Sequence, residues 1–202
     1  MILTESSILK QKCEPCSSVE EGQEIAVKLL EELTKSKNGI GLAANQIGIN
    51  KRVCVVNVPT GNNTDPIILI NPRIVEKSEE MFAFMEGCLS FPGKSVKTMR
   101  HKSVMVEADN YEGKLYFEAT PPVNKPKDLS NAFETACVQH EMDHLDGITM
   151  FDRELKQQPL KRRNKKLGRN DRVLIKKGDE TKTLKYKKID KFLSDGWELV
   201  EV

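Results

Sequence analysis

Hydrophobic positions near the start of the chain follow a helical period. Apolar side chains recur at four-residue spacing, at Ile25, Leu29 and Leu33. Such spacing places them on one face of a helix. Ser17 followed three residues later by Glu20 is typical of a capping box, and Asn38-Gly39 is typical of a helix end. The pattern therefore predicts an amphipathic helix that begins after Ser17 and ends before Gly39.

A second helical pattern precedes Gly147. One stripe at three- and four-residue spacing contains Phe133, Ala136, Cys137, His140, Glu141 and His144. Another stripe contains Val138, Met142 and Leu145. Together they predict a helix that is buried on most of its sides. Asn131, with Glu134 three residues on, is a candidate for its amino-terminal cap, and Gly147 for its stop.

Short apolar and β-branched runs between these two helices predict strands. They are RVCVVNV, IILIN, SVMVEA and KLYFEA, with a turn expected from Asn110 to Gly113 between the last two. A proline-rich loop, TPPVNKPKD, leads to the second helix. Strands followed by one buried helix indicate the α+β fold class.

The pattern changes after Phe151. KRRNKKLGR, residues 161–169, is a basic stretch that we interpret as a linker or helix end. Beyond it we expect a hairpin around Gly178-Asp179, a short helix from Lys188 to Ser194 and a closing strand. The chain is thus expected to contain a main domain at 1–160, a linker at 161–169, and a small basic β-β-α-β appendage at 170–202.

Composition is that of a soluble protein with a real core. The chain has 202 residues, 38% hydrophobic and 31% charged, with no apolar run of transmembrane length and no signal-peptide pattern at its start. We therefore expect a cytosolic protein without membrane association. Five cysteines argue against a disulfide framework. Cys13, Cys16, Cys54 and Cys137 are interpreted as buried packing residues.

Charge is distributed unevenly along the chain. Residues 161–202 hold 14 Lys and Arg against 7 Asp and Glu, a net charge of +7, whereas the preceding 160 residues hold 18 against 23. A basic tail on an acidic body indicates either a polyanionic partner or an ordinary solvated surface.

The segment QHEMDHLDG carries the clearest chemistry. His140 and His144 lie four residues apart, so on a helix they lie on one face and can bind the same metal ion, with Glu141 beside them as a general base. The alternative is a solvated charged helix, but the apolar flanks disfavour it. Two imidazoles and a carboxylate inside a core are costly to desolvate unless a cation compensates.

A catalytic site with two histidines needs a third ligand. The candidates are Cys88, His101 and an acidic residue. His101 lies among charged residues in MRHKSV, where we expect an exposed strand end. Cys88 lies in EGCLSFPG between a glycine and a Phe-Pro-Gly turn, which can hold a thiolate at a fixed angle. We therefore predict Cys88.

Three segments, GIGLAANQIG, EGCLS and QHEMDHLDG, occur in this order and resemble the signature segments of the peptide deformylase family over residues 1 to about 155. The resemblance implies an α+β fold in which antiparallel strands wrap around a central helix that carries both histidines. It also implies a cytosolic enzyme of protein biosynthesis that removes formate from the initiator methionine of N-formylmethionyl nascent peptides.

The same resemblance implies a set of residue roles. Cys88, His140 and His144 would bind Fe²⁺, for which Zn²⁺, Ni²⁺ or Co²⁺ can substitute. Glu141 would accept a proton from the attacking water and deliver it to the leaving amine. The side-chain amide of Gln46 and the backbone N–H of Leu89 would donate to the developing oxyanion.

Further implied roles concern substrate and support. Ile40 and Gly41 would lie beside a peptide bound as an added strand. Glu86 would pair with Arg100, and Asp143 or Asp146 is a candidate acceptor for a ligand imidazole.

The basic tail is expected to contact ribosomal RNA. Its ending, FLSDGWELV, resembles small tail modules of bacteriophage proteins, so a bacteriophage-type member of the family is a further interpretation.

Two other functions use the same motif. A zincin-like metallopeptidase would bind its metal through H-E-x-x-H and a distant carboxylate. A non-catalytic ribosome- or peptide-binding protein would hold a structural metal, which needs neither Glu141 nor Gln46 and normally fills its fourth position with a protein ligand.

Overall fold

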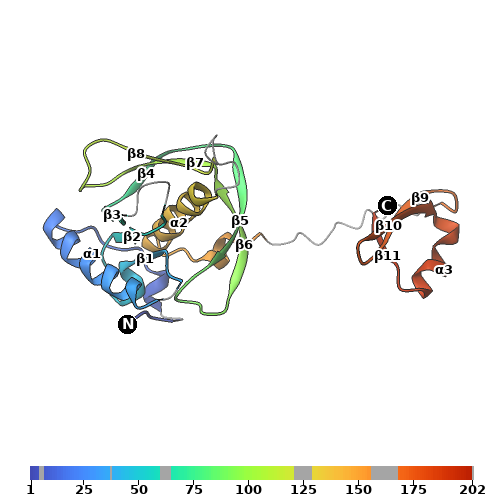
Figure 1. Cartoon of the computed structure of the whole chain (residues 1–202), viewed down its shortest axis with the longest axis horizontal. Helices are drawn as coiled ribbons and strands as arrows, with labels where there is room; N and C mark the ends of the chain where they lie inside the picture. The colour runs from blue at the N-terminus through green and yellow to red at the C-terminus, as the bar shows by residue number, and fades with distance from the viewer. Residues whose placement is uncertain (5–6, 37, 60–64, 121–128, 156–167, 202) are drawn as a thin grey trace. The chain divides into compact units, whose positions relative to one another are not determined.

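The computed structural model describes residues 1–4, 7–36, 38–59, 65–120, 129–155 and 168–201. The chain forms two compact units, Met1–Leu155 and Lys156–Val202 (Figure 1). Within the described ranges, no helix has the length and apolar character needed to cross a membrane.

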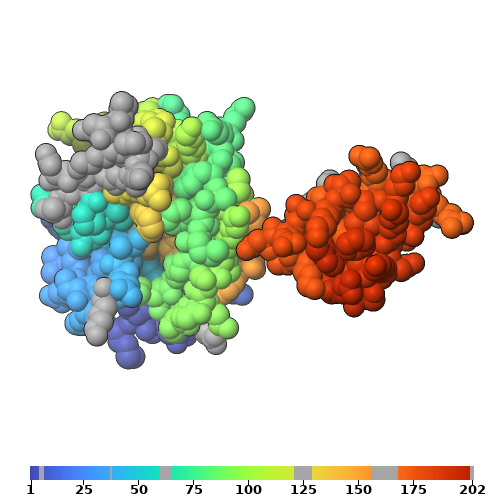
Figure 2. Space-filling model, turned by 45° about the vertical axis from the view of Figure 1, so that its right-hand side comes forward, coloured from blue at the N-terminus to red at the C-terminus, as the bar shows by residue number. Residues whose placement is uncertain are grey.

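The amino-terminal unit is built around a central helix. With η for a 3-10 helix, its elements are η1 (Ser7–Lys10), α1 (Val19–Thr34), β1 (Gly41–Ala43), η2 (Ala44–Ile47), β2 (Val53–Val56), β3 (Ile67–Ile70), β4 (Arg73–Lys77), β5 (Met81–Gly87), β6 (Ser95–His101), β7 (Ser103–Glu107), β8 (Leu115–Glu118), α2 (Ser130–Leu145) and η3 (Met150–Arg153). The strands form antiparallel sheets with orders β1-β2-β3, β4-β7-β8 and β5-β6 around α2 (Figure 1). The green surface of β5 and β6 adjoins the blue surface of the amino-terminal segments (Figure 2). The predicted α+β class is confirmed.

The sheet β1-β2-β3 is covered by a helix on each face. Strand side chains point alternately to opposite faces. Val53 and Val55 of β2 pack in the cluster that contains α1, whereas Cys54 and Val56 pack in the cluster that contains α2. This double covering explains why RVCVVNV is apolar at successive positions.

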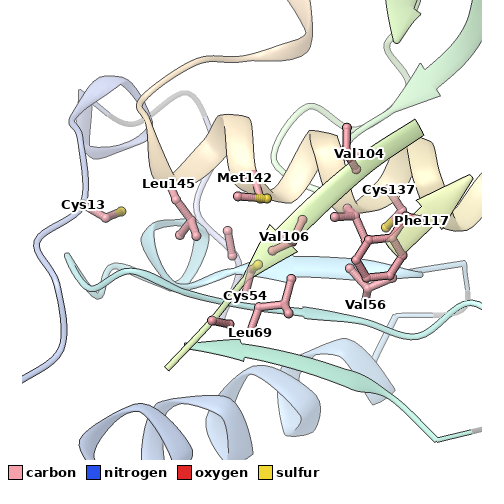
Figure 3. Close-up of a cluster of buried hydrophobic side chains, with 13 residues drawn as sticks. Cys13, Cys54, Val56, Leu69, Val104, Val106, Phe117, Cys137, Met142 and Leu145 are labelled. Atoms are coloured by element: carbon pink, nitrogen blue, oxygen red, sulfur yellow. The ribbon is translucent and has the colours of Figure 1, made fainter. Parts of the chain in front are cut away.

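The core cluster around α2 joins two sheets to the helix. Figure 3 shows Met142 and Leu145 of α2 beside Val106 of β7 and Leu69 of β3. The predicted burial of the second apolar stripe is therefore confirmed. Phe133, at the start of the helix, is 44% exposed, so the inward face predicted for it is only partly formed.

In both helices, the predicted amino-terminal cap residue is not the one that the structure shows. The cap of α1 is Ser18, whose side chain accepts from the Glu21 backbone N–H, so the predicted Ser17 and Glu20 pair was wrong by one residue. The sequence SSVEE offers both registers at the same spacing, and only the backbone conformation selects one. Helix α2 begins at Ser130, and Asn131 donates to the carbonyl of Thr120 at 3.0 Å instead of capping the helix.

A buried ionic network fixes the β5-β6 hairpin to α2. Glu86 on β5 pairs with Arg100 on β6, and Arg100 also binds Asp143 on α2. Arg153 on η3 binds Asp143 at 2.7 Å from the other side. Glu86 and Arg100 are 4% and 3% exposed, so they are almost fully desolvated and depend on each other for compensation.

The carboxy-terminal unit has the predicted β-β-α-β order. It contains β9 (Arg172–Lys177), β10 (Glu180–Lys185), η4 (Tyr186–Lys188), α3 (Ile189–Ser194) and β11 (Glu198–Glu201), with sheet order β10-β9-β11. The predicted hairpin turn lies at Gly178, whose φ of 58° suits glycine. A small core contains Val173, Ile175, Ile189 and Trp197. Residues 161–167 and 121–128, which include most of the predicted linker and proline-rich loop, lie outside the described residues.

Removing the buried guanidinium should destabilise the amino-terminal unit strongly. Arg100→Met leaves Glu86 without its cation, which is expected to cost about 3–5 kcal/mol. Urea unfolding followed by circular dichroism measures this cost, because α1 and α2 lie in that unit.

A matched control is Arg73→Met. The Arg73 side chain is 61% exposed and pairs with Glu107 at 2.7 Å, so its loss should cost about 0–1 kcal/mol. Equal losses in the two variants would contradict a special role for the buried network.

Candidate metal centre

Three candidate ligands converge from two segments. Cys88 follows β5, and His140 and His144 lie one turn apart on α2. One ligand atom from each residue lies within 4.8 Å of the others. The Sγ of Cys88 is 3.2 Å from Nε2 of His144, and the two imidazole rings have centroids 4.8 Å apart. These residues form a metal site.

The chemistry of the donors fits a divalent transition metal. One thiolate and two imidazoles supply the soft and borderline ligands that such ions prefer. His140 and His144 are 8% and 1% exposed, so little water compensates them. With three protein ligands, a tetrahedral ion retains one position for a small molecule, as in catalytic sites.

The electrostatics of the two histidines differ. Burial and the neighbouring positive charge of His140 lower the pKa of His144 to about 3, which keeps this imidazole neutral, as a ligand must be. Burial alone would lower the pKa of His140 as well. Its contacts with Cys88, Glu86 and Glu141 outweigh burial and raise its pKa to about 10, so metal binding would displace a proton from this ring. His140 therefore lies in a strongly negative environment, which also attracts a cation.

Glu86 orients the His140 ring. Its Oε2 lies 2.9 Å from Nδ1 of His140, which leaves Nε2 for a metal. Burial would raise the pKa of Glu86, but hydrogen bonds from Arg100 and His140 lower it to about 2, so it stays ionised. Thr98 also donates to Glu86, at 2.5 Å.

The expected acceptors for the imidazoles were wrong. Asp143 binds Arg100 and Arg153, and Asp146 binds Arg52 at 2.7 Å. Glu86, which is distant in sequence from His140, takes the place predicted for Asp143 because the hairpin folds over the helix. Within the described residues, Nδ1 of His144 has no hydrogen-bond partner.

Glu141 is a buried carboxylate that faces the site. It is 3% exposed, and burial raises its pKa to about 7. Its Oε2 has no partner among the described residues. A Cβ at Gly41 would collide with Oε1 of Glu141 and lie 2.6 Å from Sγ of Cys137. The missing side chain of Gly41 therefore makes room for Glu141, a contact that the sequence did not reveal.

The side-chain amide of Gln46 lies beside the thiol of Cys88. Its Nε2 lies 3.5 Å from Sγ of Cys88 and donates to Oγ of Ser90 at 3.2 Å. Its Oε1 accepts from the Ala43 backbone N–H at 2.8 Å, which fixes the orientation of the amide. Leu89 follows Cys88 in the chain and lines a cavity beside the site.

A cavity of about 440 Å³ opens beside these groups, where amino-terminal, hairpin and α2 residues meet. Its walls include Ile40, Gly41, Gln46, Phe84, Glu86, Cys88, Leu89, Phe133, Cys137, His140 and Glu141. Phe84 and Phe133 pack edge to face with centroids 5.0 Å apart. Ile40 is 38% exposed, and its carbonyl accepts from the Asn57 N–H.

Residues outside the centre are placed as follows. His101 lies at the end of β6 with Nδ1 2.7 Å from the carbonyl of Ser78, and it is not part of the ligand group. Cys13 and Cys16 are buried, as predicted.

Sequence reasoning did not identify Asn45 or Ser90 as part of the site. Both are fully buried and lie inside the motifs, next to Gln46 and Leu89. Their position as polar residues inside the motifs was the signal in the sequence, whereas their burial is visible only in the structure.

Comparison with known proteins gives a consistent result. The family model described as polypeptide deformylase matches residues 1–162. A peptide deformylase of Prochlorococcus marinus is 34% identical over 166 residues, which are 81% of this chain and 76% of the relative. A probable peptide deformylase from synechococcus phage S-SSM7 has a similar crystal structure, with a TM-score of 0.64 and 35% identity, covering 76% of this chain and 98% of the other.

The peptide deformylase of Thermotoga maritima has a TM-score of 0.64 with 30% identity, over 77% of this chain and 97% of the other. The matched region contains all three metal ligands, and the three motifs retain their order. This chain belongs to the polypeptide deformylase family.

Proposed function

We propose that the protein removes the formyl group from the initiator methionine of nascent polypeptides and releases formate, as a metal-dependent amide hydrolase. The observation that carries the proposal is the convergence of Cys88, His140 and His144 beside a buried Glu141, in a chain of this family.

Proton transfer is assigned to Glu141. Cys88, His140 and His144 would hold an ion that would supply Lewis acidity to the formyl group and to water. The pKa of Glu141 is raised to about 7 by burial, so near neutral pH the carboxylate can accept a proton from the attacking water and then donate it to the departing amine. The missing side chain of Gly41 leaves the space that this carboxylate occupies.

Stabilisation of the oxyanion is assigned to Gln46 and to the backbone N–H of Leu89. The Gln46 amide is held by Ala43 and Ser90, so it is oriented before the substrate binds. A neutral donor stabilises developing negative charge without repelling a cation. One such donor typically contributes about 3–4 kcal/mol to the transition state.

Substrate binding is assigned to the cavity and to the segment Ile40–Gly41. Aromatic and aliphatic walls, including Phe84 and Phe133, offer an apolar site for the methionine side chain. A peptide that binds as an extended strand beside Ile40–Gly41 is recognised through its main chain, with little demand on sequence beyond the first residue.

The native metal is proposed to be Fe²⁺, with Zn²⁺, Ni²⁺ or Co²⁺ able to substitute. One thiolate with two imidazoles suits all four ions, and metal availability decides among them in the cell. The proposed compartment is the bacterial cytosol, which fits five cysteines outside any disulfide.

The carboxy-terminal part is proposed to contact the ribosome. Residues 161–202 carry a net charge of +7, and the family model ends at residue 162. Ribosomal RNA is a polyanion that such a segment attracts without sequence recognition. The proposed division is a catalytic domain at 1–160, a basic linker at 161–169 and an accessory module at 170–202.

The two other functions fit the site less well. A zincin-like site needs a carboxylate as third ligand, but within the described residues the ligand group is completed by Cys88. A structural metal site does not need an acid of raised pKa such as Glu141, nor a cavity that reaches the ligands.

Loss of the general base should abolish most activity without releasing the metal. Glu141→Ala is expected to lower kcat for formate release from formyl-Met-Ala-Ser by about 10²–10⁴-fold. The metal content should stay at the native level, since Glu141 is not in the ligand group.

The matched control is Glu24→Ala, which removes an exposed carboxylate on α1 and should leave kcat unchanged. Turnover by the Glu141→Ala protein at the native rate would remove Glu141 from the reaction.

Oxygen should inactivate the iron-loaded protein. Ferrous iron and a ligand thiolate both oxidise, so formate release should decline in air, whereas protein loaded with Ni²⁺ or Co²⁺ should keep its activity. The time course of activity in air and under anaerobic conditions gives the comparison. Full persistence of the Fe²⁺ form in air would count against iron as the native metal.

Ribosome contact should depend on the basic segment. Deleting residues 161–202 is expected to abolish co-sedimentation with ribosomes, while formate release is retained. Replacing Lys161, Arg162, Arg163, Lys165 and Lys166 with glutamine in the full chain should weaken co-sedimentation and flatten its salt dependence. Unchanged co-sedimentation in both proteins would exclude an RNA contact by this segment.

A further inference from the structure

Asn45 is a fully buried amide beside Gln46 that the proposed reaction does not use. It lies in η2, and its side chain is 0% exposed. Its Nδ2 donates to the backbone carbonyl of His144 at 2.6 Å, across 99 residues of sequence. Asn45 thus joins the segment that carries the oxyanion donor to the helix turn that carries a metal ligand.

The end of α2 needs such partners. The last carbonyls of a helix have no partner within the helix and must be satisfied by other groups. The carbonyl of Leu145 is taken by the Cys13 N–H at 2.9 Å and by Arg52 at 3.3 Å. The carbonyl of His144 is taken by Asn45 and, at 3.1 Å, by the Gly147 N–H. Asn45 thus supplies a side-chain hydrogen bond of 2.6 Å to the ligand residue from a distant segment of the chain.

The other side of η2 is tied to the thiol ligand. Nε2 of Gln46 reaches Oγ of Ser90 and Sγ of Cys88, at 3.2 and 3.5 Å. Two adjacent amides therefore hold η2 between both segments that supply ligands. Asn45 carries no net charge, and its contact with the site is a hydrogen bond to the backbone of a ligand residue, so we assign it a geometric role.

We propose that Asn45 is a positioning residue that fixes η2 to the end of α2, so that the Gln46 amide and the ligand His144 keep a constant separation. The positioning of the Gln46 amide matters only if the proposed function holds, whereas the positioning of His144 concerns metal binding alone. Without the Asn45 amide, the His144 carbonyl loses its 2.6 Å partner, and η2 loses a hydrogen bond to α2. A shift of a donor or ligand by a fraction of an ångström then weakens both metal binding and turnover.

Asn45→Leu removes the amide at similar volume, and Asn45→Ala removes it without any risk of a clash. The matched control is Asn110→Leu. The Asn110 side chain also bridges backbone groups, accepting from the Ile70 N–H at 3.0 Å and donating to the Ile68 carbonyl at 2.8 Å, but it touches no ligand segment. All three variants are checked for native circular dichroism.

The deciding measurement is Co²⁺ affinity of the full chain, by absorption titration against a competing chelator. Both Asn45 variants should bind Co²⁺ about 10-fold more weakly than the native protein, a loss typical of residues that orient metal ligands. Asn110→Leu should lower the unfolding temperature but leave Co²⁺ affinity unchanged. Native affinity in the Asn45 variants, or an equal loss in Asn110→Leu, would overturn the proposal.

A double-mutant cycle tests the link to Gln46. Asn45→Leu should lower kcat for formate release about 10-fold with little change in KM, and this loss should largely disappear in a Gln46→Leu background. Full persistence of the loss there would overturn the link. If the native protein released no formate, the proposed function would fail, while Co²⁺ affinity would still decide the role of Asn45.

Discussion

Helix α2 buries two imidazoles and a carboxylate, and the surrounding structure must offset the free-energy cost of removing them from water. His140, Glu141 and His144 are almost without solvent, so each needs a partner that replaces water. Cys88 brings a thiol to the two rings, and Glu86 fixes His140 from the opposite side. The β5-β6 hairpin thus supplies a metal ligand, Cys88, and the carboxylate of Glu86, which orients the ligand His140. Its position over α2 is a requirement of the metal site as much as of the core.

The three motifs contribute complementary parts of the same centre. The first motif contributes the Gln46 amide and also Gly41, whose missing side chain leaves the space that Glu141 fills. The second brings the thiol of Cys88, and the third brings the helix. The cavity beside them is lined by apolar side chains, such as Phe84 and Phe133, and by metal ligands and Glu141. This division suits the proposed function, in which the apolar part would bind the methionine side chain while the formyl amide lies at the metal centre.

Much of the fold could be predicted from periodicity alone. The stripes of α1 and α2, the apolar runs and the small carboxy-terminal unit all follow local patterns, and the ligands follow from motif chemistry. Strands β1, β4 and β5 were not predicted from the apolar runs. The other misses concern contacts between distant residues. Glu86 meets His140 across 54 residues, and Asn45 meets His144 across 99, so no local pattern records either contact. The cap of α1 was missed for a different reason, because two serine registers were equivalent in sequence.

Catalysis of the proposed kind requires that the sulfur of residue 88 and two imidazoles bind one ion. The most direct test is the near-ultraviolet spectrum of the Co²⁺-loaded protein, where a thiolate ligand gives a charge-transfer band. The native protein and a Cys16→Ser control should show this band, and a Cys88→Asp protein that still binds Co²⁺ should lack it. An unchanged band in the Cys88→Asp protein, or no band in the native one, would contradict the account.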